Sequence, residues 1–287
     1  MSAGGSGGGG VPPSSKSERG IHSRASESPP RVFVVVSARM ASSRYRGKAV
    51  APLGGRPLLA VLLERMAAAP GVDGVVLATS TRAENDALAR LAEQGGFPVF
   101  RGDEEDVLRR HVDCARQVGA DHVVRVTGDN PLTDLETLAR LVDLHLEERS
   151  DYTYVPGDAL LMGILSEVVS RSALERSWQK GEGRHRSELM TLYIKEHPQE
   201  FRIVTGTLPD GLYRPEYRLT VDEAEDVALL QEIFARLQRP GRLVTTREAI
   251  ALLDREPELA RINAHLRHKA ANLRSVALDT GIVGKAR

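Results

Sequence analysis

The chain has 287 residues, and its 39 Lys and Arg balance 39 Asp and Glu, so the formal net charge at neutral pH is zero. This balance argues against a generally basic nucleic-acid-binding protein, and the 41% hydrophobic content is that of a globular protein with a sizeable core. The single cysteine, Cys114, excludes an internal disulfide and a four-thiolate zinc site, and the longest apolar runs are too short to span a membrane.

The first 30 residues are expected to form a disordered tail, because Gly, Ser and Pro make up 19 of them. They contain no apolar segment that resembles a secretory signal. Together with the single cysteine, this predicts a cytoplasmic protein.

Strands and helices alternate from residue 32 onward. Apolar, β-branched runs predict strands at residues 32–36, 74–78, 98–100 and 122–126, and helical periodicity predicts helices at residues 57–69, 82–94, 104–118 and 135–148. Single helices between strands are typical of βαβ units, which the right-handed crossover rule builds into one open sheet. The predicted fold class is therefore α/β, with a mostly parallel central sheet and helices on both faces.

The pattern becomes less regular after residue 151. Residues 151–215 are expected to insert mixed strands and a lid, with strands at 164–169 and 201–205 and helices at 173–179 and 187–196. A last strand at 217–221 and a helix at 223–237 complete a domain that spans residues 31–244. The helical extension at 245–287 carries apolar residues that need a partner, which is either the core domain or a second subunit of a homodimer.

The loop after the first strand is the segment most suited to chemistry, since ligands of open α/β sheets bind at the carboxyl ends of the strands. Residues 37–48 combine small residues and hydroxyls with four cations, namely Arg39, Arg44, Arg46 and Lys48. This composition suits a polyphosphate cradle, although neither the Walker pattern nor the dinucleotide fingerprint is present. A basic surface loop is the alternative interpretation.

Two aspartates also follow predicted strands. Asp129 and Asp222 could converge on Mg²⁺, which needs few protein ligands. Locally, however, Asp129 fits a turn before Pro131, and Asp222 fits a helix N-cap with Glu225 three residues later. Taken alone, each aspartate favours its structural interpretation.

Taken together, these segments resemble the cytidylyltransferases that make CMP-activated acidic sugars, in particular the branch named after a spore coat polysaccharide biosynthesis protein. The resemblance runs from residue 32 to about residue 267. It is carried by residues 38–44 with Gly47 and Lys48, and by residues 53–58, 78–80, 99–102, 128–131 and 219–222. It implies a Rossmann-like nucleotidyltransferase fold, Mg²⁺ as cofactor, and transfer of CMP from CTP to an oxygen of an anionic small-molecule acceptor with release of pyrophosphate.

The resemblance also implies roles for individual residues. Arg39 and Lys48 would be catalytic. Both would also bind the triphosphate, together with Ala38 and Arg44. The nucleoside would be bound by Thr79, Ser80, Arg101 and Gly102, the metal by Asp129 and Asp222, and the acceptor by Arg186 and Glu188. From the residues alone, Thr79 and Ser80 could equally cap the following helix.

This chain departs from the family pattern at three places. Tyr45 and Arg46 replace the usual Leu-Pro before Gly47, and residues 160–165 lack an acid often found there. The segment around Glu188 lacks the usual flanking basic residues; residues 184–186, which include Arg186, could substitute for them or could form a solvated helix entry. Two alternatives therefore stay open: a sugar-1-phosphate nucleotidyltransferase that uses another nucleotide, and a non-catalytic nucleotide-binding regulator. A glycosyltransferase is disfavoured because no Asp-x-Asp motif follows a predicted strand.

Overall fold

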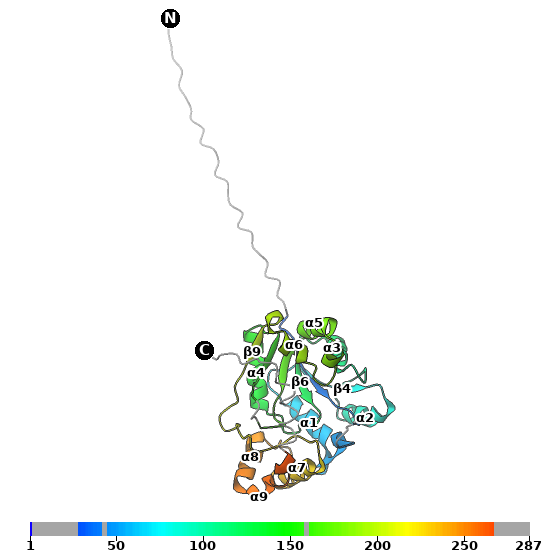
Figure 1. Cartoon of the computed structure of the whole chain (residues 1–287), viewed down its shortest axis with the longest axis vertical. Coiled ribbons are helices and arrows are strands. Elements are labelled where there is room, and N and C mark those ends of the chain that lie inside the picture. The colour runs from blue at the N-terminus through cyan, green and yellow to red at the C-terminus, as the bar shows by residue number, and fades with distance from the viewer. Residues whose placement is uncertain (2–27, 42–44, 158–160, 267–287) are drawn as a thin grey trace.

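The computed structural model describes Met1 and residues 28–41, 45–157 and 161–266. Most of the expected tail, as well as Arg44 and the last residues of the extension, lies outside these ranges. The described part of the chain forms a seven-stranded sheet in the order β5-β4-β1-β6-β8-β7-β9 (Figure 1). Its strands are β1 (Val32–Ser37), β4 (Gly74–Ser80), β5 (Val99–Gly102), β6 (His122–Thr127), β7 (Tyr152–Tyr154), β8 (Glu167–Ser170) and β9 (Ile203–Thr205).

The sheet is mostly parallel. The pairings β1 with β4, β1 with β6, β4 with β5 and β7 with β9 are parallel, and β8 runs antiparallel to both β6 and β7. Strand β1 is buried on both faces: Val34 and Val36 pack into one core cluster, and Phe33 and Val35 pack into another. A continuous apolar strand in the middle of a parallel sheet is stable for this reason.

Helices cover both faces of the sheet, as the alternating pattern predicts. One face is covered by α1 (Leu58–Ala67), α2 (Asp86–Gln94) and α4 (Leu135–Glu147), and the other by α3 (Val107–Val118), α5 (Arg171–Lys180) and α6 (Leu192–Glu196). Cys114 lies in the second layer, where burial raises the pKa of its thiol to about 12. Its expected role as a small core residue agrees with this position.

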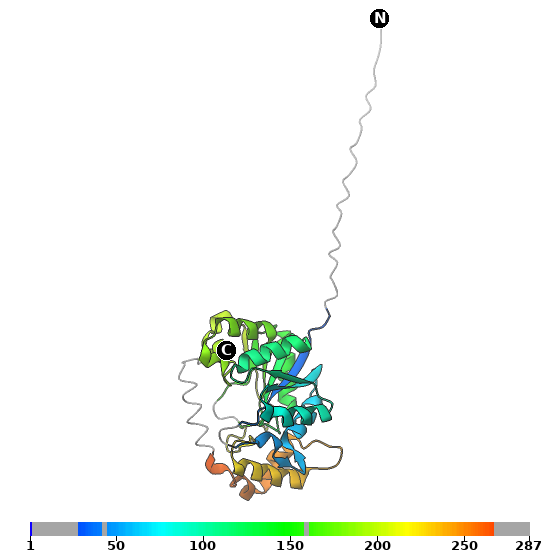
Figure 2. The same cartoon turned by 90° about the vertical axis from the view of Figure 1, so that its right-hand side faces the viewer.

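A third cluster lies at one end of the molecule (Figures 1 and 2). It contains the hairpin β2 (Pro52–Leu53) with β3 (Arg56–Pro57), and the helices α7 (Ala224–Leu237), α8 (Thr246–Arg255) and α9 (Pro257–Ala260). Ile250, Leu253 and Leu259 of the extension are buried there against α7 and its neighbours. The same chain therefore supplies the apolar partner that the extension needs. Within the described ranges, no helix combines the length and apolar character that crossing a membrane requires.

The structure corrects the irregular parts of the prediction. Residues 217–221 do not form a strand, because β8 already pairs with the free edge of β6; they make a single bridge from Arg218 to Met162. The helix expected at 187–196 begins only at Leu192, after an irregular segment. The two-residue strands β2 and β3, and the short strand β7, are too short for periodicity to reveal.

Candidate active site

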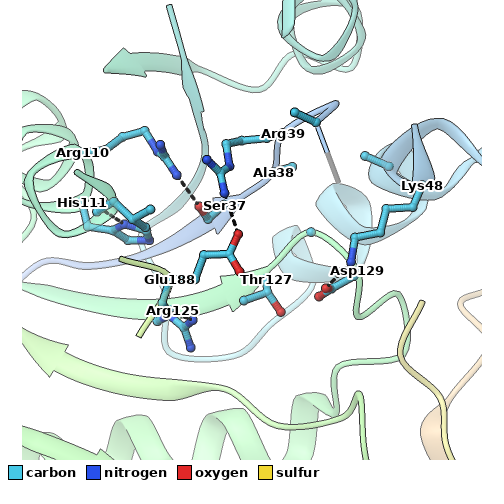
Figure 3. Close-up of a pocket in the computed structure, with 14 residues that line it drawn as sticks. Ser37, Ala38, Arg39, Lys48, Arg110, His111, Arg125, Thr127, Asp129 and Glu188 are labelled. Atoms are coloured by element: carbon cyan, nitrogen blue, oxygen red, sulfur yellow. Dashed lines mark hydrogen bonds and ion pairs between the residues drawn. The ribbon is translucent and has the colours of Figure 1, made fainter. Parts of the chain in front are cut away.

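A cavity of about 280 Å³ opens at the carboxyl ends of β1 and β6 (Figure 3). Five of the predicted site residues line it: Ala38, Arg39, Lys48, Asp129 and Glu188. The remaining lining residues are Ser37, Ala41, Ala49, Val107, Arg110, His111, Arg125, Thr127 and Gly128. The position agrees with the rule that ligands of open α/β sheets bind beyond the carboxyl ends of the strands.

Two loops approach closely to form the cavity floor. The backbone N–H of Gly128 donates to the carbonyl of Ser37 at 2.8 Å, and a Cβ atom at position 128 would lie only 2.6 Å from the Cβ of Ala38. Glycine is therefore required here by the contact between the two loops. The buried side chain of Asn85 fixes the first loop from the other side, since its Oδ1 accepts from the N–H of Met40 at 2.7 Å.

Lys48 joins the first loop to both predicted metal ligands. Gly47 has a φ of 76°, which glycine adopts without strain, and it precedes a short 3₁₀ helix that begins at Lys48. Lys48 Nζ donates to Asp129 Oδ2 at 2.7 Å and to Asp222 Oδ1 at 2.9 Å. Burial lowers the pKa of Lys48, but the two carboxylates outweigh it and raise the pKa above 10.5. Two carboxylates thus converge on one cation.

The structure decides whether Asp222 caps the following helix or faces the cavity cluster. Helix α7 has Glu223 as its N-cap, in a capping box with Asp226, so the interpretation of Asp222 as the N-cap is wrong. Asp222 instead faces Lys48 with one oxygen and accepts from Arg218 Nη2 at 2.9 Å with the other. Arg218 is buried and also pairs with Asp226, so this ion pair network fixes the orientation of Asp222.

For Asp129, the turn and the site coexist. Asn130 closes the turn, because its Nδ2 donates to Thr127 Oγ1 at 2.8 Å and its carbonyl accepts from Thr133 at 2.8 Å. The side chain of Asp129 is thereby left to face Lys48 at the cavity wall.

Arg39 connects the loop predicted to bind phosphate to the segment predicted to bind the acceptor. Its Nη1 donates to Glu104 Oε1 at 3.0 Å, and its Nη2 donates to Glu188 Oε1 at 2.6 Å. The Glu188 side chain is 76% exposed, so this pair lies at the cavity mouth and stays accessible to exchange with other anions. By contrast, the Arg46 side chain is 81% exposed and does not line the cavity.

The residues predicted to contact the nucleoside lie beside the cavity without lining it. Thr79 and Ser80 are fully buried at the end of β4, and Ser80 Oγ accepts from Asn85 Nδ2 at 2.7 Å. Arg101 donates to the carbonyl of Ser80 at 3.0 Å, and Gly102 ends the neighbouring strand. The four residues therefore lie at the ends of β4 and β5, where the following loops begin. That they bind the nucleoside stays a prediction.

Arg186 is not brought to the cavity. Its guanidinium lies over the ring of Trp178, donates to the carbonyl of Gly181 and lies 3.8 Å from a carboxylate oxygen of Asp106. Arg44 lies outside the described residues. Of the pair predicted for the acceptor, only Glu188 therefore lines the cavity.

Three charged or titratable cavity residues were not predicted from the sequence: Arg110, His111 and Arg125. Arg110 and His111 occupy buried positions of helix α3, and nothing local marks them as site residues. The one available signal was Arg125, a charged residue within the otherwise apolar strand predicted at residues 122–126.

Arg125 is positioned by the carboxylate of Glu167, whose side chain is only 16% exposed. Its Nη1 donates to Glu167 Oε2 at 2.9 Å, and Lys195 donates to the other oxygen of Glu167 at 3.0 Å. Burial by itself raises the pKa of Glu167, but the charges of Lys195 and Arg125 lower it to about 2. The carboxylate is thus ionised at neutral pH and fixes the orientation of Arg125.

Comparison with known proteins identifies the family. A family model described as cytidylyltransferase matches residues 33–248. The chain is 36% identical to the spore coat polysaccharide biosynthesis protein SpsF of Bacillus subtilis, over 80% of this chain and 96% of the relative. It is 35% identical to the 3-deoxy-manno-octulosonate cytidylyltransferase of Anaeromyxobacter dehalogenans, over only 39% of this chain and 46% of that protein.

A solved structure supports the same assignment. The cytidylyltransferase from Leptospira borgpetersenii superposes with a TM-score of 0.74 at 27% identity, covering 80% of this chain and 97% of that structure. Sequence family, fold and the position of the cavity therefore agree, and the chain belongs to the cytidylyltransferase family.

Proposed function

We propose that this protein transfers CMP from CTP to an oxygen of an acidic sugar or a related anionic small molecule, and releases pyrophosphate. The observation that carries the proposal is the convergence of Lys48, Asp129 and Asp222, with Arg39 beside them, at the carboxyl ends of β1 and β6. This arrangement places cations and a candidate metal site together on the loops that would meet a triphosphate.

The residues present fit Mg²⁺. Asp129 and Asp222 both point at one position, which is taken by the ammonium of Lys48, so the carboxylate pair already binds a cation there. Within the described ranges no group of three or more His, Cys, Asp or Glu could hold a metal. Two carboxylates still suit Mg²⁺, which keeps several water and phosphate oxygens as ligands. When bound, the ion would neutralise phosphate charge.

The chain's own cations would handle the leaving group. Lys48 would exchange its two carboxylate partners for phosphate oxygens, and Arg39 would exchange Glu188 for a second set of phosphate oxygens through its planar fork. Both charges matter most when negative charge moves onto the departing pyrophosphate. A covalent intermediate is not needed, and Cys114 is unsuited to form one because burial raises its pKa.

The acceptor class rests on charge and on relatives. Four cationic side chains and two acidic ones line the cavity, which favours an anionic ligand. One partial relative is named for an acidic sugar, 3-deoxy-manno-octulosonate. The family match favours CTP over the nucleotides of the alternative sugar-1-phosphate nucleotidyltransferase.

Pyrophosphate release tests this function directly. The purified protein is incubated with Mg²⁺, each of the four nucleoside triphosphates and a panel of acidic sugars, and pyrophosphate is measured by a coupled assay. We expect release with CTP and at least one acidic acceptor. Release with another nucleotide in place of CTP would overturn the base assignment. Binding of CTP without turnover on any acceptor would favour the non-catalytic regulator.

A further inference from the structure

The end of the cavity farthest from Lys48 carries groups that the metal and triphosphate assignments leave unused. Figure 3 shows Arg110, His111 and Arg125 gathered at one side of the cavity, with Lys48 and Asp129 at the other. Arg125 belongs to β6, which lies on the opposite side of β1 from β4 and β5, where the predicted nucleoside residues are located. A ligand whose phosphates lie over β1 would therefore present its acceptor side to Arg125.

His111 supplies an unusual hydrogen-bonding group at this end. Its Nδ1 lies 2.8 Å from the carbonyl of Val107, which can only accept, so the ring proton resides on Nδ1 and Nε2 carries a lone pair. The ring is fully buried, and Nε2 has no hydrogen-bond partner among the described residues. Burial first, and then the charges of Arg110 and Arg125, lower the pKa of His111 to about 3. At neutral pH the ring is thus a hydrogen-bond acceptor and not a cation.

The two neighbouring guanidinium groups have capacity for an anion. Arg110 donates to the carbonyls of Asp103 and Glu104 and to the hydroxyl of Ser37, and its Nε has no partner within the described ranges. Arg125 Nη2 donates to the backbone carbonyl of Glu188 at 3.0 Å. A carbonyl is a weaker partner than a carboxylate, so an anionic ligand can replace it.

We propose that Arg125 and His111 form the acceptor subsite, in which Arg125 binds the anionic group of the acceptor and Nε2 of His111 accepts a hydrogen bond from one of its hydroxyls. This inference rests on the proposed function, which supplies the acceptor. Nε2 is covered in the free protein, so binding requires side chains to move, and the Arg125 guanidinium would exchange the Glu188 carbonyl for the ligand. His111 thereby selects hydroxylated acids over equally charged acids without hydroxyls, since a buried acceptor left unpaired is costly.

Two probes of equal charge and chain length separate the two contacts. D-Gluconate and hexanoate each carry one carboxylate and six carbons, but only gluconate has hydroxyls. Their dissociation constants are measured by calorimetry on protein saturated with Mg²⁺ and α,β-methylene-CTP, which prevents turnover. We expect gluconate to bind the wild type at least about tenfold more tightly than hexanoate, in line with a pocket that pairs ligand hydroxyls.

The variants assign the contacts. His111→Phe keeps an aromatic ring but removes the hydrogen-bond acceptor, so it should reduce the preference for gluconate by about tenfold. His111→Gln retains an acceptor oxygen and should keep most of the preference. Arg125→Met should weaken both probes by about tenfold or more. His145→Phe is the matched control: His145 is also fully buried, both of its ring nitrogens are bonded and it does not line the cavity, so the preference should stay unchanged.

The outcomes distinguish this inference from the proposed function. Failure of the wild type to bind the CTP analogue would count against the function itself. If the analogue binds but the wild type shows no preference for gluconate, or if the preference survives in His111→Phe, the role of His111 is refuted. If Arg125→Met binds hexanoate as the wild type does, the anion contact is refuted. Thermal melts of each variant verify folding, and His111→Leu, which also removes the acceptor, serves if His111→Phe does not fold.

Discussion

The two ends of the cavity have opposite electrostatic character. At one end the carboxylates of Asp129 and Asp222 outnumber the single charge of Lys48, so the cluster is acidic and suited to a cation. At the other end Arg110 and Arg125 surround a neutral His111, so the cluster is basic and suited to an anion. Under the proposed function, this difference would orient the ligand in the cavity of about 280 Å³, with the metal and phosphates near Lys48 and the acidic acceptor near Arg125.

Removing the charge of Lys48, at the acidic end, should reduce turnover more than any other substitution. Lys48→Met keeps most of the apolar stem but removes the ammonium, and we expect turnover to fall by about 10² to 10³, the usual cost of deleting one aimed electrostatic group. Steady-state kinetics at saturating CTP measure this loss. In the same variant, Asp129 and Asp222 lose their shared cation, so the melting temperature should fall without Mg²⁺ and recover when Mg²⁺ is added.

Arg46 provides the control for Lys48. Its side chain is 81% exposed, so Arg46→Pro, which restores the residue usual in the family, should retain activity. If Lys48→Met turned over CTP normally while Arg46→Pro were inactive, the phosphate contact would belong to Arg46 and the acidic end would need a new interpretation.

Substitution of either aspartate should reduce turnover to a similar extent, but the two variants should differ in stability. Asp129→Asn and Asp222→Asn each remove one metal-facing charge, and we expect turnover to fall by on the order of 100-fold in both. Asp222 also binds the buried Arg218, so Asp222→Asn should in addition lower the free energy of unfolding by about 1–3 kcal/mol. Kinetics and thermal melts together measure this difference. Near wild-type turnover of either variant at saturating Mg²⁺ would exclude that residue as a ligand.

Arg39 should show a smaller, geometry-dependent effect. Arg39→Lys keeps the charge but cannot reproduce two parallel hydrogen bonds, so we expect kcat/KM for CTP to fall by about tenfold. The comparison with Arg39→Met separates charge from geometry. Equal activity of Arg39→Lys and the wild type would show that Arg39 acts only as a point charge.

The basic end should make the fold sensitive to acid. The pKa of His111 is lowered to about 3 in the folded protein, so the unfolded chain binds more protons below its ordinary value of 6.5, and stability falls as the pH drops from 6.5 toward 3. This histidine alone should cost about 1 kcal/mol at one pH unit below 6.5. Glu167, with a pKa of about 2, contributes stability above pH 4.5 that is lost as the pH falls toward 2.

Urea unfolding at pH 7.5, 6.5 and 5.5 measures the histidine contribution. His145, whose pKa is also about 3, contributes in the same direction, so His111→Phe should reduce the pH dependence without abolishing it. An unchanged dependence in that variant would mean that His111 is not neutral in the folded protein.

The smallest effect is expected at Arg186. Its guanidinium contacts Trp178 and Gly181 and does not reach the cavity, so Arg186→Ala should change kcat and KM by less than about twofold. A large rise in KM for the acceptor, without a change in melting temperature, would show that Arg186 moves into the site during binding.

The sequence by itself determined the central sheet and part of the acidic end of the cavity. The apolar runs at β1, β4 and β6 are local signals, and the residues that follow them must meet at one edge because parallel strands end together. The positions of the Lys48 loop and of Asp129 follow from this rule. Asp222 was grouped with Asp129 through a predicted strand at 217–221 that does not form, so its approach to Lys48 was not determined in this way.

Only the tertiary structure decided the rest. Asp222 is drawn to Lys48 and Arg218, which leaves the capping of α7 to Glu223, and residues 217–221 stay out of the sheet because β8 occupies the edge of β6. Arg125 and His111 come together because β6 and α3 share one core cluster beside the cavity, and no local pattern encodes that arrangement. The basic end of the cavity is thus built from side chains that adjacent elements bring together. At the acidic end the loops that carry Lys48 and Asp129 follow from strand order, whereas the segment that carries Asp222 does not.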